Sequence, residues 1–162
     1  MGSKPSRNIV ILLIAIFLLT PLTGCFGQKL DFQASEFSGN DLIPGSFTTQ
    51  TLTTSQFSLH IQDSLFEKET AQELYNQVLA DYTALSTLLQ ADRHLDIYIL
   101  EDSLVDDVLL DGTSIYCNVK DVEKGDYQTA LVTAYTDFNL PWKLAGVEGA
   151  AFGDEIDVNE LR

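Results

Sequence analysis

The sequence is poor in the residues that most often build catalytic and metal centres. Its 162 residues include two histidines, two cysteines, one methionine and one tryptophan. Two cysteines cannot make a disulfide scaffold, and two histidines leave little for a histidine-rich metal site. Basic residues are also scarce, with nine Lys and Arg against 24 Asp and Glu, for a net charge of −15. Because nucleic-acid phosphates require a basic surface, we expect neither DNA nor RNA as a partner.

Acidic residues are absent from the first 30 positions, and this absence divides the chain into two parts. Every acid lies at or after Asp31, whereas Lys4 and Arg7 precede an uninterrupted apolar run from Ile9 to Leu19. A short basic region followed by such a run is typical of a secretory signal peptide. The alternative is a transmembrane anchor, but eleven apolar residues rise only about 16 Å as a helix, against about 30 Å of hydrocarbon. We therefore expect a signal peptide over residues 1–24.

The four residues from Leu22 to Cys25 read Leu-Thr-Gly-Cys and follow this apolar run. They resemble the lipobox of bacterial lipoproteins, L-x-[GA]-C, in which the signal is cut before a cysteine that carries diacylglycerol through a thioether. The resemblance implies lipidation at Cys25, with fatty acyl chains such as palmitate. It also implies a membrane partner and a place on the extracytoplasmic side of the cell membrane. An N-myristoylation pattern at Gly2 and Ser6 is present too, but it would leave the apolar run unexplained.

A flexible tether is expected between the anchor and the folded domain. Residues 25–46 contain Gly, Pro and polar residues without a sustained period. From Cys25 onward the chain carries seven basic and 24 acidic residues, a formal charge of −17. Anionic headgroups repel such a domain, so we expect it to stand off the bilayer. Cys117 is then the remaining cysteine, and its apolar neighbours predict a buried core thiol.

Residues 47–162 show the patterns of strands and helices in one α+β domain. Alternating apolar residues predict a strand over about 56–62 after a Thr-rich strand, with His60 on the opposite, solvent-facing side. Residues 95–100 and 113–119 predict two more strands, and His94 is expected to be exposed just before the first of them.

A capping box of Ser64 and Glu67 predicts the start of a long helix over about 65–90. Its apolar positions recur at spacings of three and four, which is typical of a helix that covers a sheet. Asp126 is expected to cap a second helix, and Pro141 to open a third that runs to about residue 151. The last residues, 154–162, look like the start of another helix in a domain that continues further. The predicted fold is a small mixed or antiparallel sheet with a long covering helix, followed by two or three C-terminal helices.

Five acids between Glu101 and Asp111 raise the hypothesis of a calcium site. The spacing does not fit an EF-hand loop, which requires D-x-[DN]-x-[DN]-G and a glutamate at the twelfth position. A solvated acidic loop is the favoured interpretation.

The second and third helices carry a resemblance to a known family. The segment Leu131–Phe138 reads LVTAYTDF, and Leu140–Val147 reads LPWKLAGV. Together with the order of elements, they resemble peptidase MA-like zinc metallopeptidase domains (gluzincins), in which L-V-H-E-x-x-H precedes a helix starting near P-x-W-L-x-E-G-L-A. The resemblance covers about residues 55–153 and implies a zincin-like domain that is incomplete in this chain.

The departures from that family decide the expected chemistry. Thr133 stands at the first zinc histidine, Ala134 at the general-base glutamate and Asp137 at the second histidine. The third ligand falls at Ala145 or at Glu148, depending on register. A zinc peptidase requires three protein ligands and a carboxylate that takes the proton of the bound water. The resemblance therefore implies a degenerate domain with no catalytic residues, no metal and no cofactor.

The sequence contains no G-x-S-x-G, no P-loop and no G-x-G-x-x-G motif. We expect a membrane-anchored lipoprotein of the bacterial cell envelope whose domain is a non-catalytic binding or structural module, with an envelope protein as its partner. Two alternatives stay open: an envelope hydrolase that uses a carboxylate pair, and a degenerate metallopeptidase that retains some metal binding.

Overall fold

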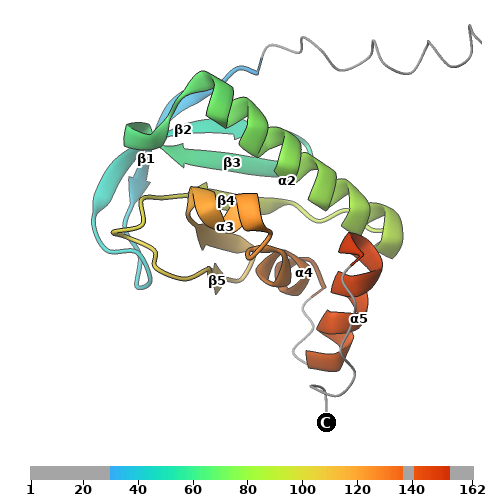
Figure 1. Cartoon of the computed structure of the whole chain (residues 1–162). Coiled ribbons are helices and arrows are strands. Elements are labelled where there is room, and N and C mark those ends of the chain that lie inside the picture. Colours follow the sequence, from blue (N-terminus) through green and yellow to red (C-terminus); the bar gives the residue numbers. More distant parts are fainter. Residues whose placement is uncertain (1–29, 137–140, 154–162) are drawn as a thin grey trace, which may run out of the picture. The chain divides into compact units, whose positions relative to one another are not determined.

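The computed structural model describes residues 30–136 and 141–153, which form a mixed α+β domain (Figure 1). This architecture confirms the fold class predicted from the sequence. The strands are β1 (Gln33–Ser38), β2 (Ser46–Thr53), β3 (Phe57–Gln62), β4 (Leu95–Ile99), β5 (Leu109–Asp111) and β6 (Ser114–Cys117). The helices are the 3-10 turn η1 (Asp63–Leu65), α2 (Lys68–Leu89), α3 (Val119–Lys124), α4 (Gln128–Thr136) and α5 (Pro141–Phe152). None of the described helices is long and apolar enough to cross a membrane.

The six strands form one sheet in the order β1-β2-β3-β4-β6-β5. The central strands β3, β4 and β6 are parallel, and the pairs at both ends of the sheet are antiparallel. The long helix α2 connects β3 to β4, so these three elements form a βαβ unit. The mixed sheet therefore joins two antiparallel margins through a parallel centre.

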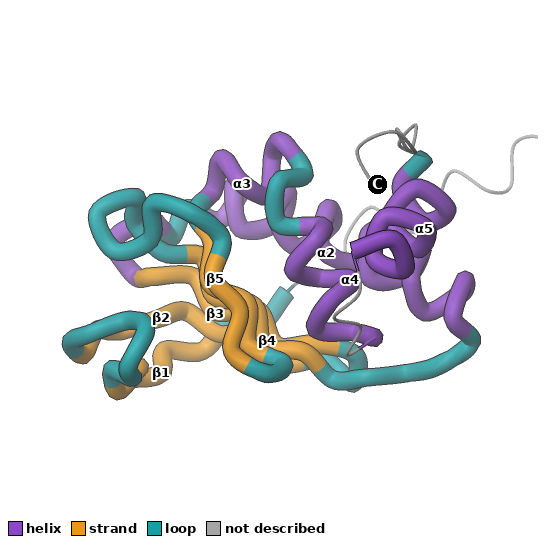
Figure 2. Tube along the Cα trace, turned by 90° about the horizontal axis from the view of Figure 1, so that it is seen from below, coloured by secondary structure: helices purple, strands orange, loops and turns teal. Residues whose placement is uncertain are grey.

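The main core lies between the sheet and the helices, which are gathered on one side of the strands (Figure 2). Phe57, Leu59 and Ile61 alternate into this core as predicted, and all three are at most 1% exposed. Burying each such side chain contributes about 1.5–3 kcal/mol to stability, because apolar surface leaves water. The pattern with a period of two therefore orients β3 and leaves its other face for polar residues.

The long helix begins later than predicted, and the predicted capping box does not form. Ser64 lies in η1, where its Oγ donates to Oε1 of Glu101 at 2.5 Å. Glu67 is the N-cap residue of α2, and its side chain makes no capping hydrogen bond. The prediction is wrong because β3 leads into a 3-10 turn before the helix, which moves the helix start three residues beyond the predicted one.

A capping box is present at α3, a short helix whose first residue lies in the strand predicted over residues 113–119. The Asn118 side chain accepts from the Asp121 amide at 3.1 Å, and the Asp121 carboxylate accepts from the Asn118 amide at 2.9 Å. This reciprocal pair satisfies two amides that a helix start leaves without partners. The predicted strand over residues 113–119 therefore ends at Cys117.

The predicted flexible tether over residues 25–46 is wrong for residues 33–46. β1 pairs with β2 over its whole length, from Gln33 opposite Thr51 to Ser38 opposite Ser46. The connecting turn buries Ile43 completely, so an apolar anchor outweighs the Gly and Pro residues around it. Gly39 is required in this turn, because an added Cβ would collide with the carbonyl oxygen of Gly45.

Candidate functional site

The sheet face opposite the helices is divided into an apolar half and a polar half. In the apolar half, the segments after β1 and β4 cover a second cluster of buried residues, namely Phe37, Ile43, Leu100, Val105 and Tyr116. The polar half is formed by the first half of β1, the second half of β2 and the first halves of β3 and β4. We take this polar half as the candidate functional site, because it groups the two histidines of the sequence with hydroxyl and carboxylate side chains.

One row of side chains crosses the boundary between the two halves. Thr51, His60, Tyr98 and Tyr116 lie opposite one another on four neighbouring strands. The His60 ring stacks on Tyr98 with centroids 4.2 Å apart and an interplanar angle of 8°. Tyr98 in turn stacks on Tyr116 at 4.9 Å. These cross-strand contacts fix the imidazole ring in place at the polar end of the row.

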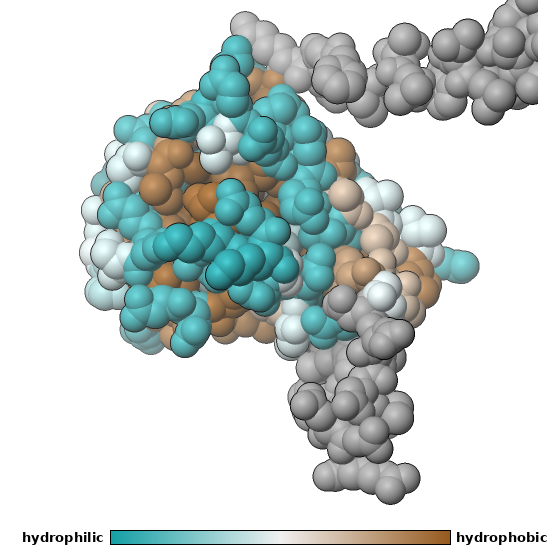
Figure 3. Space-filling model, viewed as in Figure 1, coloured by the Kyte–Doolittle hydropathy of each residue, from teal (hydrophilic) through white to brown (hydrophobic). Residues whose placement is uncertain are grey.

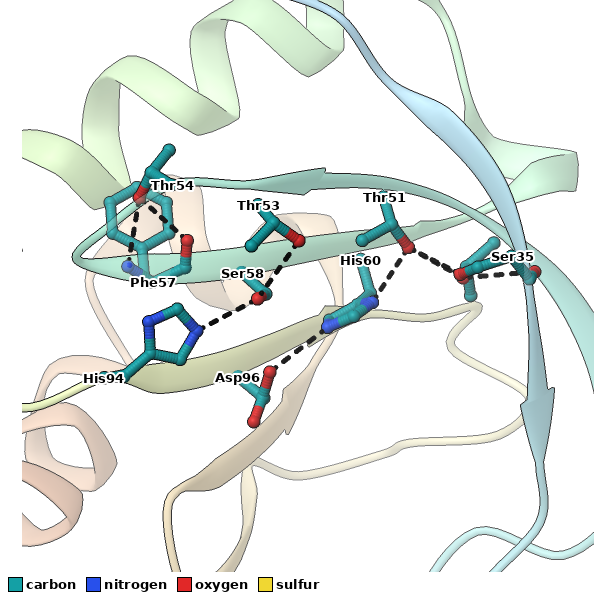
Figure 4. A network of polar contacts seen from close by, with 10 residues as sticks. Ser35, Thr51, Thr53, Thr54, Phe57, Ser58, His60, His94 and Asp96 are labelled. Carbon is teal, nitrogen blue, oxygen red and sulfur yellow. Dashed lines mark hydrogen bonds and ion pairs between the residues drawn. The ribbon is translucent and has the colours of Figure 1, made fainter.

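Both ring nitrogens of His60 have polar partners (Figure 4). The Nδ1 atom lies 2.9 Å from Oγ1 of Thr51, and the Nε2 atom lies 3.4 Å from Oδ1 of Asp96. The side chain is only 15% exposed. The structure thus confirms that His60 lies on the face opposite the core, but it is a half-buried part of a network more than a solvent-facing residue.

Burial lowers the pKa of His60 below its ordinary value of 6.5, and the positive charge of a protonated His94 would lower it further. The hydrogen bond and the charge of Asp96 oppose this effect without cancelling it. The imidazole is therefore neutral at neutral pH, with one nitrogen as a donor and the other as an acceptor. Burial also raises the pKa of Tyr98 to about 12, with Asp96 as a second cause.

The network continues from Thr51 to the first strand of the sheet. The Ser35 hydroxyl lies 2.7 Å from that of Thr51 and 2.9 Å from that of Thr49. The two threonine hydroxyls lie 3.2 Å apart, and Thr49 is only 1% exposed. Hydrogen bonds thus connect β1, β2, β3 and β4 through side chains as well as through the backbone.

The second histidine lies in the same half of the face. His94 is exposed, as predicted, and its Nε2 atom lies 3.0 Å from the hydroxyl of Ser58. That hydroxyl donates to Oγ1 of Thr53 at 3.4 Å. The site therefore offers imidazole, hydroxyl and carboxylate groups side by side, which suits hydrogen bonding to a polar ligand.

The sequence predicts the positions of His60 and His94 at the strands but makes neither a site residue, and it predicts none of their partners. Ser58, His60 and Asp96 alternate with buried residues, so the period of two gives their common face. Thr51 and Ser35 join the same network only through the register of β1 and β2, and β1 lies within the predicted tether.

Those positions of the gluzincin resemblance that the structure describes lie elsewhere, in α4 and α5. The Thr133 hydroxyl donates to the Thr129 carbonyl at 2.8 Å, and the Thr129 hydroxyl donates to Oε1 of Glu148 at 2.8 Å. Ala134 is 1% exposed and belongs to the main core. Thr133 and Glu148 are thus both hydrogen-bonded to Thr129. Asp137 lies outside the described residues.

Two acids of the segment after β4 have polar partners. Glu101 accepts from Ser64 and Ser103, and Asp102 forms an ion pair with Lys120. Within residues 30–136 and 141–153, no group of three His, Cys, Asp or Glu residues is placed to hold a metal ion.

Cys117 is fully buried, which confirms the prediction of a core thiol. Its Sγ donates weakly to the Tyr98 carbonyl at 3.8 Å. Burial raises the pKa of the thiol well above its usual range, so the nucleophilic thiolate is strongly disfavoured.

A hollow of about 240 Å³ lies between α2 and α3, lined by residues that include Thr70, Gln77 and Glu123. On this side of the molecule hydrophilic residues cover much of the surface, and hydrophobic atoms show between them (Figure 3). The walls of the hollow carry the carboxylates of Glu73 and Glu123 and the apolar side chains of Leu74 and Val122.

Comparison with known proteins assigns no family to the chain. No family model, no curated protein and no solved structure matches the chain. The lipoprotein signal and the likeness to gluzincins therefore stay predictions from the sequence.

Proposed function

We propose that this chain is a membrane-anchored lipoprotein of the bacterial cell envelope, lipidated at Cys25, whose acidic domain is a binding module. The observation that carries the anchor is the Leu-Thr-Gly-Cys motif directly behind the apolar run from Ile9 to Leu19. The proposal places the domain outside the cytoplasm, where an envelope protein is its partner.

The surroundings of two residues support a module without zinc-peptidase chemistry. Ala134 has no proton-accepting group and is buried in the core, whereas a zinc peptidase needs a carboxylate there to activate water. The Thr133 hydroxyl is bonded to its own helix, and zinc prefers thiolate, imidazole or carboxylate ligands.

The position of β1 makes the proposed tether short. Residues 26–32 are the seven residues between Cys25 and the first strand. The eight steps from Cys25 to Gln33 span at most about 28 Å when fully extended. A domain lipidated at Cys25 would therefore stay close to the bilayer, although its charge of −17 opposes contact with anionic headgroups.

Lipid labelling in a bacterial host tests the anchor. With an alkyne analogue of palmitate, the natural chain should take up the label and fractionate with membranes. Cys25→Ser should lose the label, whereas Cys117→Ser is the matched control and should keep it. Label retained by Cys25→Ser would refute the proposal.

A metal and activity assay tests the second part. Purified Cys25→Ser protein should bind no stoichiometric zinc and should hydrolyse no member of a broad peptide library. Stoichiometric zinc, together with hydrolysis that a chelator abolishes, would overturn the binding-module proposal and leave the anchor untouched.

A further inference from the structure

Within the part of the chain that the structure describes, strand β1 is an edge of the sheet that lacks most of the usual protection. It is the terminal strand of the sheet order, and its six residues pair continuously with β2 without a bulge. Natural edge strands are blunted by Lys, Pro, bulges or very short length, because their outward amides and carbonyls attract another strand. β1 reads Gln-Ala-Ser-Glu-Phe-Ser, so Glu36 is its one charged residue.

The segment that carries this edge is acidic, with Lys29 and Lys68 just outside it. From Leu30 to Glu67 the sequence contains five acidic residues and neither Lys nor Arg. All five are exposed: Asp31, Glu36, Asp41, Asp63 and Glu67. An approaching strand therefore meets a negative potential, which favours a basic segment and disfavours a second acidic copy of this chain.

Two surface hollows lie along β1 and its neighbour. One, of about 320 Å³, is lined by residues 34–36 and 46–48. The other, of about 380 Å³, is lined by residues 31, 33–35 and 51–53. Both include the small side chains of Ala34 and Ser35 in their lining. Strand addition uses such hollows to take side chains of the added strand, while main-chain hydrogen bonds give affinity.

The polar network holds this edge in place. Ser35 is bonded to Thr49 and Thr51, and Thr51 is bonded to His60 in β3. On the same face, Phe37 stacks on Phe47 at 4.7 Å. An edge that is already rigid loses little conformational entropy on binding, which increases affinity.

We infer that the outer edge of β1 binds an extended, basic segment of a partner protein, which adds to the sheet as a further strand. The inference rests on the proposed role as a binding module and names the surface and the chemistry of the partner.

Model peptides test this inference on the full-length Cys25→Ser protein. The probe is a fluorescent peptide of alternating Lys and Val, compared with a Glu and Val peptide and with a Lys and Val peptide interrupted by a central Pro. We expect the basic probe to bind by fluorescence anisotropy, and both comparison peptides to bind at least about tenfold more weakly. The bound probe should slow hydrogen exchange of amides in Gln33–Ser38.

A charge reversal locates the contact. Glu36→Lys should weaken probe binding by about tenfold, because it places a cation on the edge as natural protected strands do. The matched control is Glu69→Lys on the exposed surface of α2, which has the same change in net charge and should leave affinity within about twofold. Circular dichroism confirms that both variants fold.

Three outcomes would overturn the inference: equal binding of the proline-interrupted probe, no protection of β1, or equal loss in the two charge variants. Protection of β1 that depends on protein concentration without any probe would instead assign the edge to a second copy. These results are independent of lipid labelling, so failure at β1 and failure of the anchor at Cys25 are distinguishable.

Discussion

Tyr127 donates a hydrogen bond of 2.6 Å from its hydroxyl to Oδ2 of Asp81, and both side chains are buried. The side-chain amides of Gln77 and Gln128 donate to the same oxygen at 3.1 and 3.3 Å. A buried carboxylate is costly without such partners. These contacts join α2 to the segment that opens α4.

Removing the tyrosine hydroxyl should therefore destabilise the domain. We expect Tyr127→Phe to lower the free energy of unfolding by about 1–3 kcal/mol, because the Asp81 carboxylate loses its shortest hydrogen bond. Urea unfolding followed by circular dichroism measures the change. Tyr75→Phe, at a half-buried position of α2, the helix that carries Asp81, is the control and should cost less than about 0.5 kcal/mol. Equal costs would show that the bond to Asp81 adds nothing.

The lowered pKa of His60 predicts that stability depends on pH. The unfolded chain takes up a proton as the pH falls below 6.5, whereas the folded protein resists protonation until a lower pH. The contribution of the neutral His60 to stability is therefore full above pH 6.5 and is lost as the pH falls through the pKa of His60 in the folded protein. The groups that face this imidazole are Thr51, Asp96, Tyr98 and His94.

The measurement is the urea midpoint at about pH 7.5 and about pH 5.5, a window in which histidine titrates. His60→Gln keeps polar groups at the site but cannot titrate, so its midpoint should change less between the two pH values. His94→Gln controls for the second imidazole. A fall in midpoint that is as large in His60→Gln as in the natural chain would contradict this explanation.

Cys117 should be inert while the domain is folded. In the Cys25→Ser protein it is the remaining thiol, and its burial hinders both access and ionisation. We expect the rate of reaction with Ellman's reagent to be lower by a factor on the order of 1,000 in buffer than in urea. Fast labelling of the native protein would mean that β6 opens readily.

The turn between β1 and β2 should not tolerate an added methyl group at Gly39. Its Cβ would meet the backbone of Gly45, which cannot move without breaking the turn. We expect Gly39→Ala to cost about 2 kcal/mol or more. Gly146→Ala in α5 meets nothing within 4 Å and should instead add up to about 1 kcal/mol, because alanine favours the helix. Thermal unfolding of the two variants compares them directly, and similar shifts of one sign would refute the steric reason.

The period of the apolar residues predicts much of this fold, because burial on one face determines both the type and the orientation of an element. Residues 56–62 and 95–100 are strands nearly as predicted, and α5 begins at Pro141. The period fails at β1, where exposed residues give no alternating pattern and pairing depends on a distant partner. It also fails at α3, whose six residues are too few to show a helical period.

The candidate site shows the same division between local and distant information. The sequence places His60 on the outer face of its strand, because its neighbours are buried. Its bonds to Thr51 and Asp96 depend on the registers of β2 and β4, and short sequence patterns do not encode them. The buried hydrogen bond between Tyr127 and Asp81 joins residues 46 positions apart, and short sequence patterns do not predict it either.

The strand order has a consequence for how the chain reaches its native state. The antiparallel margins, β1 to β3 and β5 with β6, close through short connections, whereas β4 pairs in parallel with strands on both sides. The pair of Phe57 and Leu95 brings together residues that are far apart in the chain. Because non-local parallel pairing forms more slowly than hairpins, we expect the margins to form first and the insertion of β4 between them to be the slow step of refolding.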